Sequence, residues 1–224
     1  MSNHSRFAVY YAPPPGAFAD FGAHWLGWQV EGGRAVVQPA VPNIEALTAA
    51  PRKYGFHGTL KPPFRLSDGM TLDGLRAALA DLAIRVAPAQ ADGLVLTRLG
   101  HWFALTPTGD TMGIAQVAAA CVTELDRFRA PASEAELDKR RKGDLTAAQV
   151  AYLTRWGYPY VFDQFRFHLT LTGKVPADAI DGVESQIRAC LPALPKPFAL
   201  AEVCLCGERT DGRFEVLHRY TLTG

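Results

Sequence analysis

The sequence lacks an excess of charge of either sign. Its 224 residues carry 23 Lys and Arg against 22 Asp and Glu, which leaves a formal net charge of +1. Proteins that coat DNA or RNA usually have a strong basic excess, so this balance argues against a binder of long nucleic acids. It does not exclude a local basic pocket for a small anion.

Long hydrophobic runs are also absent. No run of apolar residues reaches the length of about 18 that a membrane-spanning helix needs, so we expect no membrane partner. The opening stretch, MSNHSRFAVYY, lacks the long apolar run of a secretory signal. Cysteines without a signal peptide are typical of reduced thiols, and these features together predict a cytoplasmic protein.

Cysteines are few, and their spacing forms no metal-binding pattern. The four are Cys121, Cys190, Cys204 and Cys206. The first two lie in helical patterns and are expected to be small apolar core residues. The last two share a face of a predicted strand, but no CxxC or second pair completes a ligand set. We therefore predict neither a metal site nor a cofactor.

The sequence does contain one short motif twice. Phe-His-Gly-Thr-Leu at 56–60 returns as Phe-His-Leu-Thr-Leu at 167–171, in the other half of the chain. Alternate side chains of a strand point to opposite faces, so His57 and Thr59 share one face of their strand. His168 and Thr170 do the same in the second copy, while the hydrophobic neighbours of each pair take the opposite face.

The periodicity of the rest of the chain predicts alternating strands and helices. Strand patterns occupy 6–13, 54–66, 92–110, 165–173 and 198–222, with proline runs at 13–15 and 62–63 expected to stop the first two. Helical patterns occupy 17–28, 71–86, 112–129 and 177–191. Two further helices between 133 and 160 are indicated by capping boxes, Ser133 with Glu136 and Thr146 with Gln149.

Each copy of the motif is followed by a helix and then a strand pair. Hydrophobic residues make up 48% of the chain, enough for a substantial core. We therefore expect an α+β fold, a single domain over 1–224 made of two duplicated lobes. Each lobe would be an antiparallel sheet with helices, in halves of about 1–111 and 157–224, with 112–156 as a helical bridge. The active groove would lie between the lobes.

Two histidine–threonine pairs that face one groove suit phosphate ester chemistry. A neutral histidine can remove a proton from water, and a protonated one can supply a proton to a departing oxygen. Threonine hydroxyls can donate hydrogen bonds to phosphoryl oxygens. No metal is needed for this division of labour.

The paired motifs resemble those of the 2H phosphoesterase superfamily, which includes cyclic nucleotide phosphodiesterases and RNA ligase-type proteins. The stretches at 6–14, 53–64 and 155–173 are similar, more narrowly, to uncharacterised bacterial proteins encoded beside phosphonate-degradation genes. The resemblance spans nearly the whole chain, and it implies a fold and a reaction type rather than a substrate. The catalytic residues that it implies are His57, Thr59, His168 and Thr170.

We therefore expect a metal-independent phosphoesterase that hydrolyses a small phosphodiester, with a place in phosphonate metabolism. Cyclic substrates, such as a ribose 1,2-cyclic or a nucleotide 2′,3′-cyclic phosphate, are the leading candidates. The sequence does not say which histidine is the acid and which the base. Two alternatives stay open, namely a non-catalytic module that binds a nucleotide or RNA end, and ligase-type chemistry in the reverse direction.

Four further residues are candidates for substrate binding, and each also has a structural interpretation. Lys61 follows Thr59 by two positions and would neutralise phosphate charge, or is a solvated lysine. Arg166 would share the face of His168. Tyr10 would line the groove or pack at the sheet. Tyr160 belongs to WGYPYVF, which would stack a base or sugar, or form a rigid turn.

Overall fold

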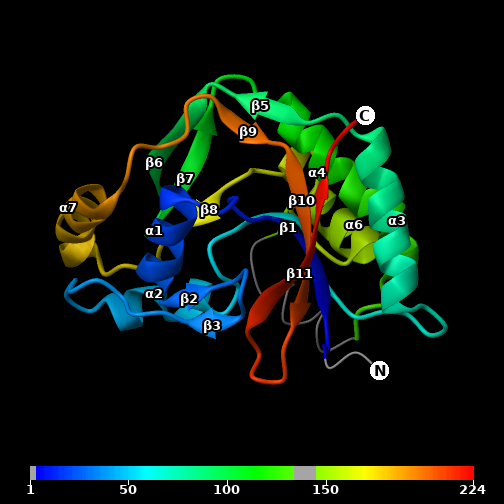
Figure 1. Ribbon diagram of the computed structural model, residues 1–224, viewed down its shortest axis with the longest axis horizontal. Coiled ribbons are helices and arrows are strands. Elements are labelled where there is room, and N and C mark those ends of the chain that lie inside the picture. Colours follow the sequence, from blue (N-terminus) through cyan, green and yellow to red (C-terminus); the bar gives the residue numbers. More distant parts are fainter. Residues whose placement is uncertain (1–3, 134–144) are drawn as a thin grey trace.

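A seven-stranded antiparallel sheet runs through the computed structural model, which describes residues 4–133 and 145–224 (Figure 1). Its strand order is β11-β10-β1-β4-β8-β7-β6. In chain order these strands are β1 (Phe7–Tyr11), β4 (Gly58–Phe64), β6 (Gly93–Leu99), β7 (Trp102–Thr108), β8 (Leu169–Thr170), β10 (Glu202–Glu208) and β11 (Phe214–Thr221). Two smaller sheets pair β2 (Trp28–Gln29) with β3 (Arg34–Ala35), and β5 (Ala89–Ala91) with β9 (Phe198–Leu200).

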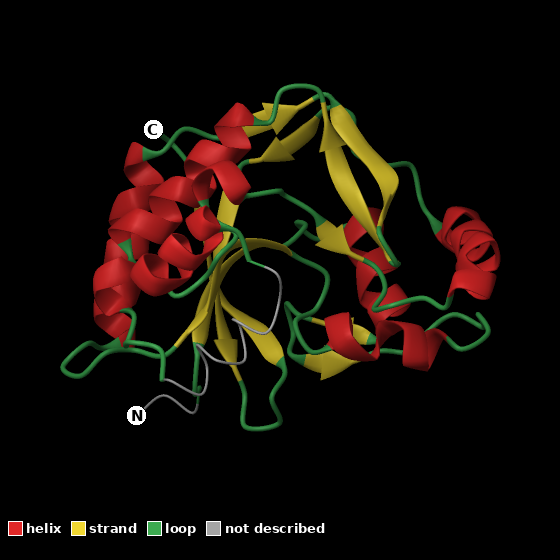
Figure 2. Cartoon of the chain, turned by 180° about the vertical axis from the view of Figure 1, so that it is seen from behind, coloured by secondary structure: helices red, strands yellow, loops and turns green. Residues whose placement is uncertain are grey.

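The helices gather in two groups beside the sheet. The α-helices are α1 (Ala17–Leu26), α2 (Ile44–Arg52), α3 (Leu72–Arg85), α4 (Met112–Glu124), α6 (Ala147–Trp156) and α7 (Ile180–Cys190). Helices α3, α4 and α6 lie beside β1, β10 and β11, whereas α1, α2 and α7 lie towards β6, β7 and β8 (Figures 1 and 2). Short 3-10 turns are η1 (Asp126–Phe128), η2 (Phe162–Gln164) and η3 (Ala177–Ala179). Within the described residues, no helix combines the length and apolar character needed to cross a membrane.

The strand order mixes the two halves of the chain. The hairpin β6–β7, which follows the first motif, pairs through β7 with β8 of the second half. The hairpin β10–β11, which follows the second motif, pairs through β10 with β1 of the first half. The expected α+β class with antiparallel sheets is therefore confirmed, but the sheet does not divide at the boundaries 1–111 and 157–224. The hydrophobic pattern of a segment predicts that it forms a strand, but it does not predict which other strand it pairs with.

Helix α3 illustrates how local sequence fixes an element and its buried face. The side chain of Thr71 accepts a hydrogen bond from the backbone of Gly74 and so caps the first turn. Leu75, Leu79 and Leu82 then recur at helical spacing and are fully buried in the core. The expected capping box of α6, Thr146 with Gln149, is also present, whereas the one at Ser133 and Glu136 falls partly outside the described residues.

Strand β4 does not stop at its proline pair. It continues through Pro62 and Pro63 to Phe64, although a proline cannot donate a hydrogen bond to a neighbouring strand. The ladder between β1 and β4 shifts register twice, between Phe7 and Val9 and again between Val9 and the next residue. Such irregularities are where a missing backbone donor is tolerated, which is why the strand continues past the prolines.

Candidate active site

The two copies of the motif meet where β4 pairs with β8. Gly58, the central residue of the first copy, lies directly opposite Leu169, the central residue of the second. A side chain at Gly58 would collide with the ring of Phe167, because an added Cβ would lie 2.4 Å from its carbon atoms. The glycine that distinguishes the first copy from the second therefore allows the two strands to approach.

This register gathers the four polar residues of the motifs on one face of the sheet. Antiparallel strands run in opposite directions, so the bridge places His57 opposite Thr170. By the same rule it places Thr59 opposite His168. Opposite residues have Cβ atoms about 4.5–5.5 Å apart and share a face. The two histidines therefore occupy one diagonal of a small square and the two threonines the other.

The imidazole of His57 is held at both nitrogens. Its Nδ1 lies 2.9 Å from the carbonyl oxygen of Gly55, and a carbonyl only accepts, so Nδ1 carries the proton. Its Nε2 lies 3.0 Å from Oγ1 of Thr59, whose hydroxyl donates to it when the ring is neutral. Burial lowers the pKa of His57 to about 4; the Gly55 carbonyl opposes this shift and the charge of His168 adds to it.

Tyr10 lies against this imidazole rather than in a ligand cavity. The two ring centroids are 3.9 Å apart, with the planes at 32°. Tyr10 is only 1% exposed, and its hydroxyl is buried with no hydrogen-bond partner among the described residues. Of the two interpretations of Tyr10, packing therefore fits this geometry, with His57 as the packed group.

His168 is oriented in the same way as His57. Its Nδ1 lies 2.7 Å from the carbonyl oxygen of Arg166, so its Nε2 is the nitrogen left for chemistry. The ring makes an edge-to-face contact with Trp102, with centroids 5.2 Å apart. Burial lowers the pKa of His168, and the Arg166 carbonyl opposes that shift. Trp102 was not among the sequence candidates, because its position beside β8 depends on a strand pairing.

A cavity of about 490 Å³ opens beside this square of side chains. Thr59 and His168 line it, whereas His57 and Thr170 are not among its lining residues. Aromatic side chains make up much of its wall: Trp102, Tyr158, Tyr160, Phe162 and Phe165. An aromatic wall of this kind suits a ligand with a planar ring.

Two of the predicted ligand-binding residues lie on this cavity. Tyr160 is 46% exposed and lines it. Arg166 also lines it and is exposed, and its guanidinium donates to the carbonyl oxygens of Asp163 at 2.9 Å and Phe165 at 2.7 Å. These bonds hold the guanidinium beside the cavity and leave further N–H donors for an anion.

Lys61 is not a ligand-binding residue of the kind that its spacing predicts. Tyr10 pairs with Thr59, but the preceding residue, Val9, pairs with Lys61. Two neighbouring residues of β1 thus face three of β4, and Leu60 is the extra residue of a β-bulge. The bulge breaks the period of two, so Lys61 turns to the face opposite to that of Thr59.

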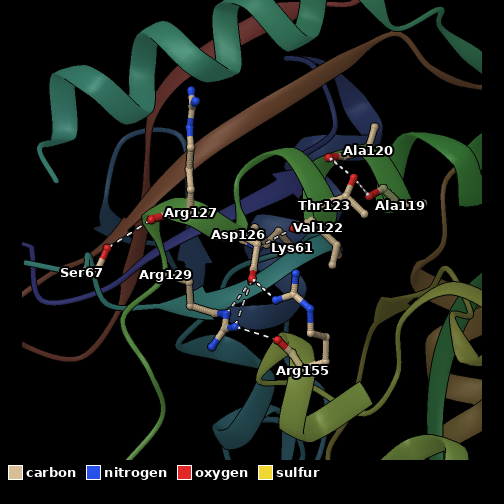
Figure 3. Close-up of polar contacts among 10 residues, drawn as sticks. All are labelled: Lys61, Ser67, Ala119, Ala120, Val122, Thr123, Asp126, Arg127, Arg129 and Arg155. Atoms are coloured by element: carbon tan, nitrogen blue, oxygen red, sulfur yellow. Dashed lines mark hydrogen bonds and ion pairs between the residues drawn. The ribbon is translucent and has the colours of Figure 1, made fainter. Parts of the chain in front are cut away.

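The ammonium group of Lys61 is instead buried under helix α4. The residue is 2% exposed, and its Nζ donates to the carbonyl oxygen of Val122 at 3.0 Å (Figure 3). Nζ also lies 3.8 Å from Oδ1 of Asp126. Burial lowers the pKa of Lys61 to about 8, and the Asp126 carboxylate opposes this shift.

The cysteines are free, and three of them, Cys121, Cys204 and Cys206, are buried. Burial raises the pKa of the thiol of Cys121 to about 12, so it is an inert core residue at neutral pH. Within 4–133 and 145–224, no group of three or more His, Cys, Asp or Glu side chains could hold a metal ion.

Comparison with known families and curated proteins gives one family match and two curated relatives. The model of a family described as "Protein of unknown function (DUF1045)" matches residues 59–215. A protein of Janthinobacterium sp. (strain Marseille) named "Ribose 1,5-bisphosphate phosphokinase PhnN" is 37% identical over 204 residues, which is 85% of this chain and 45% of that protein. A protein of the same name from Laribacter hongkongensis (strain HLHK9) is 37% identical over 182 residues, 79% of this chain and 41% of its own. The chain therefore spans less than half the length of these relatives.

Solved structures give a more distant likeness. E. coli LigT complexed with phosphate has a TM-score of 0.48 and 15% identity, with 100% of both chains covered. The same protein complexed with 3′-AMP has a TM-score of 0.46 and 17% identity, covering 98% of this chain and 99% of that one. At these values the likeness transfers no residue role and no ligand to this chain.

Proposed function

The chain belongs to the DUF1045 family of proteins of unknown function, and we propose that it is a phosphoesterase that hydrolyses a small phosphodiester with two histidines. The observation that supports this proposal is the register of β4 and β8, which sets His57, Thr59, His168 and Thr170 on one face. Two imidazoles whose Nδ1 atoms are fixed by backbone carbonyls, so that Nε2 is left for proton transfer, and two hydroxyls are the groups that metal-independent hydrolysis of a phosphodiester needs.

We assign the role of general base to His57 and that of general acid to His168. Burial lowers the pKa of both histidines, and a pKa of about 4 keeps His57 neutral, so its Nε2 can accept a proton from water once the Thr59 hydroxyl turns away from it. The water oxygen then bonds to phosphorus while the bond from phosphorus to the departing oxygen breaks. His168, protonated at Nε2, gives its proton to that oxygen. The products are a phosphate monoester and an alcohol, and solvent restores both protonation states.

Thr59 connects the base to the reacting group. While His57 is neutral, the single hydroxyl proton of Thr59 points at Nε2, 3.0 Å away. With a substrate bound, the hydroxyl can turn its proton to a phosphoryl oxygen, which opens Nε2 to the proton from water. Once protonated, Nε2 donates to Oγ1 and holds the hydroxyl in that orientation. Thr59 would thus bind the phosphoryl group most strongly after proton transfer, an interaction that favours the transition state. Thr170 would supply a second donor.

Two cyclic phosphates remain the leading substrates. The aromatic wall of the cavity favours a nucleoside 2′,3′-cyclic phosphate, whose base would stack beside Tyr160 and Trp102. The name of the curated relatives favours a ribose 1,2-cyclic phosphate with a 5-phosphate, since opening its ring at the 2-oxygen would yield ribose 1,5-bisphosphate. Arg166 would contact the second phosphate. The expected place in phosphonate metabolism rests on this name and on the family resemblance.

Kinase activity itself is not proposed for this chain. Its only Gly-Lys pair, Gly173 and Lys174, is followed by Val175, whereas the phosphate-binding loop of many nucleoside triphosphate enzymes reads Gly-x-x-x-x-Gly-Lys-Ser/Thr. The curated relatives contain more than half their length outside the match, and that part is the candidate for phosphoryl transfer.

A panel of cyclic phosphates tests the proposal. Both candidates and simple phosphodiesters would be incubated with wild type, His57→Ala and His168→Ala, with and without EDTA, and products identified by ³¹P NMR. We expect turnover by wild type alone, unchanged by EDTA. Calorimetric binding without turnover would favour the non-catalytic module. Condensation of a phosphomonoester with an alcohol, without net hydrolysis, would favour ligase chemistry. Activity lost to EDTA and restored by zinc would contradict the metal-independent mechanism.

A further inference from the structure

Lys61 is a buried cation that the proposed mechanism does not use. It lies between the two register shifts of β4, two residues after Thr59. Only 2% of the residue is exposed, and the ring of Phe64 lies 5.3 Å from Nζ. Burying an ammonium group costs free energy that an apolar side chain of similar length would not cost. Its presence therefore calls for a role in the geometry of the site.

The partners of Lys61 form a compact network around one carboxylate (Figure 3). Asp126, with a side chain 13% exposed, lies 3.8 Å from Nζ of Lys61. Its Oδ1 accepts from Nε of Arg129 at 2.7 Å, and its Oδ2 accepts from Nη1 of Arg155 at 3.2 Å. Arg129 also donates to the carbonyl oxygen of Arg155 at 3.0 Å. One acidic group thus binds three cations from three segments of the chain.

These segments are the supports of the candidate site. Lys61 belongs to β4, which carries the first motif, and its bond to Val122 reaches a residue of α4 that lines the cavity. Arg155 lies in the last turn of α6, which ends at Gly157 in the left-handed conformation. The chain then enters the aromatic wall of the cavity at Tyr158. The network therefore joins β4, which follows His57, to the aromatic wall of the cavity, which precedes His168 in the chain.

We propose that Lys61 and Asp126 are positioning residues of this site. Lys61 fixes the bulge that directly follows Thr59 and so holds the strand that carries Thr59 in place, and Asp126 holds the end of α6, and with it the aromatic wall, against β4. This inference rests on the proposed function, since it names the residues that keep the catalytic face and the ligand cavity aligned.

The first test measures kinetics on whichever phosphodiester wild type turns over. Lys61→Met keeps the length of the side chain and removes its charge, and we expect kcat to fall about tenfold, since small displacements of reacting groups are costly. Asp126→Asn should raise KM about fivefold through the loosened wall. The double variant should lose less than the product of both effects, because the residues act as one unit. Kinetic parameters of Lys61→Met and Asp126→Asn equal to those of wild type, or multiplicative losses, would overturn the proposal.

A matched control is the exposed ion pair of Arg85 and Glu124, whose side chains are 50% and 36% exposed. Glu124 ends the same helix that receives the bond from Lys61. Glu124→Gln should leave kcat and KM within about twofold of wild type, as expected for an exposed pair. A loss equal to that of Lys61→Met would show a general effect of charge at α4 and would overturn the proposal.

A second readout does not depend on turnover. Hydrogen–deuterium exchange should become faster at 58–64 in Lys61→Met and at 157–168 in Asp126→Asn, while α3 stays protected. If wild type turns over no phosphodiester, the proposed function fails, and the exchange pattern still decides whether these residues position the two segments. Unchanged exchange in both variants would overturn the proposal. If Lys61→Met does not fold, the kinetics and exchange of Asp126→Asn decide.

Discussion

The imidazole of His57 lies on the ring of Tyr10, with centroids 3.9 Å apart. The tyrosine ring is buried and excludes water from one side of the imidazole, so the charged form of His57 loses hydration that its bond to the Gly55 carbonyl replaces only in part. Burial is therefore the main reason that His57 is neutral, and the charge of His168 contributes less. This relationship suggests a role for Tyr10 that does not involve contact with a ligand.

Replacing Tyr10 tests that relationship. In Tyr10→Leu, water reaches the imidazole, and we expect the pKa of His57 to rise from about 4 towards the ordinary 6.5. Tyr10→Phe keeps the ring and removes a buried hydroxyl that has no described partner, so it should leave that pKa low and stability unchanged or higher. The measurement is an NMR titration, with His57→Ala to assign the signal. Equal pKa values in the Leu and Phe variants would contradict the prediction.

Removal of either histidine should abolish most of the activity. General acid–base catalysis by one positioned group is worth about 10²–10⁴-fold, or roughly 3–5 kcal/mol of barrier. We expect His57→Ala and His168→Ala each to lower kcat by such a factor, and the double variant to fall well short of the product. Both side chains are half-buried beside a cavity rather than in the core, so circular dichroism spectra should match wild type. Near-wild-type kcat in either variant would leave the motif with a binding role only.

The pH profile of kcat/KM should reach its maximum on the acid side of pH 6.5. The mechanism needs a neutral His57, whose pKa is about 4, and a protonated His168, whose pKa is also lowered by burial. The productive form of the free enzyme is therefore most abundant between the two pKa values. Initial rates at low substrate concentration from pH 3.5 to 8 check this. A maximum above pH 7 would show that other groups carry the proton transfers.

The pKa of His57 also makes stability depend on pH. Between about pH 4 and 6.5 the unfolded chain binds a proton at this residue that the folded chain does not, so the free energy of unfolding rises with pH. The contribution is complete above pH 6.5 and is lost as pH falls towards 4, by about 1–3 kcal/mol. Urea unfolding across this window should therefore show a shallower slope in His57→Ala than in wild type. Parallel slopes would mean that the imidazole stays solvated.

The local part of this fold is readable from the sequence. The strand pattern that contains Phe103 and Leu105, and the helical spacing of Leu75 and Leu79, predict elements that the structure contains. Helix α2 was missed, because Asn43 makes no side-chain cap and Pro51 lies inside the helix. The strand at 165–173 was overextended, since β8 retains only two residues of ladder. The pairing of strands in the folded protein decides where a strand such as β8 ends, and no short stretch of sequence predicts that pairing.

In the candidate site, too, the sequence predicted the local features but not those that depend on two strands together. The faces of His57 with Thr59 and of His168 with Thr170 follow from the period of two, and the pairing of β4 with β8 agrees with them. The prediction that Lys61 shares the face of Thr59 was wrong, because Leu60 is an extra residue in the strand. A bulge changes the face of every residue after it, and it is defined by two strands together, so one strand alone cannot reveal it.

The exchange of hairpins between the halves of the chain has a consequence for synthesis on the ribosome. Strand β1 pairs with β10, which is synthesised long after it. The hairpin β6–β7 likewise lacks a partner strand until β8 has been synthesised, and β8 is also the strand that brings His168 to His57. A nascent chain that has passed only the first motif therefore holds one histidine on an incomplete sheet. Chemistry that needs both imidazoles begins only after the sheet has closed around the late strands, so a prematurely terminated product would carry the first motif without its activity.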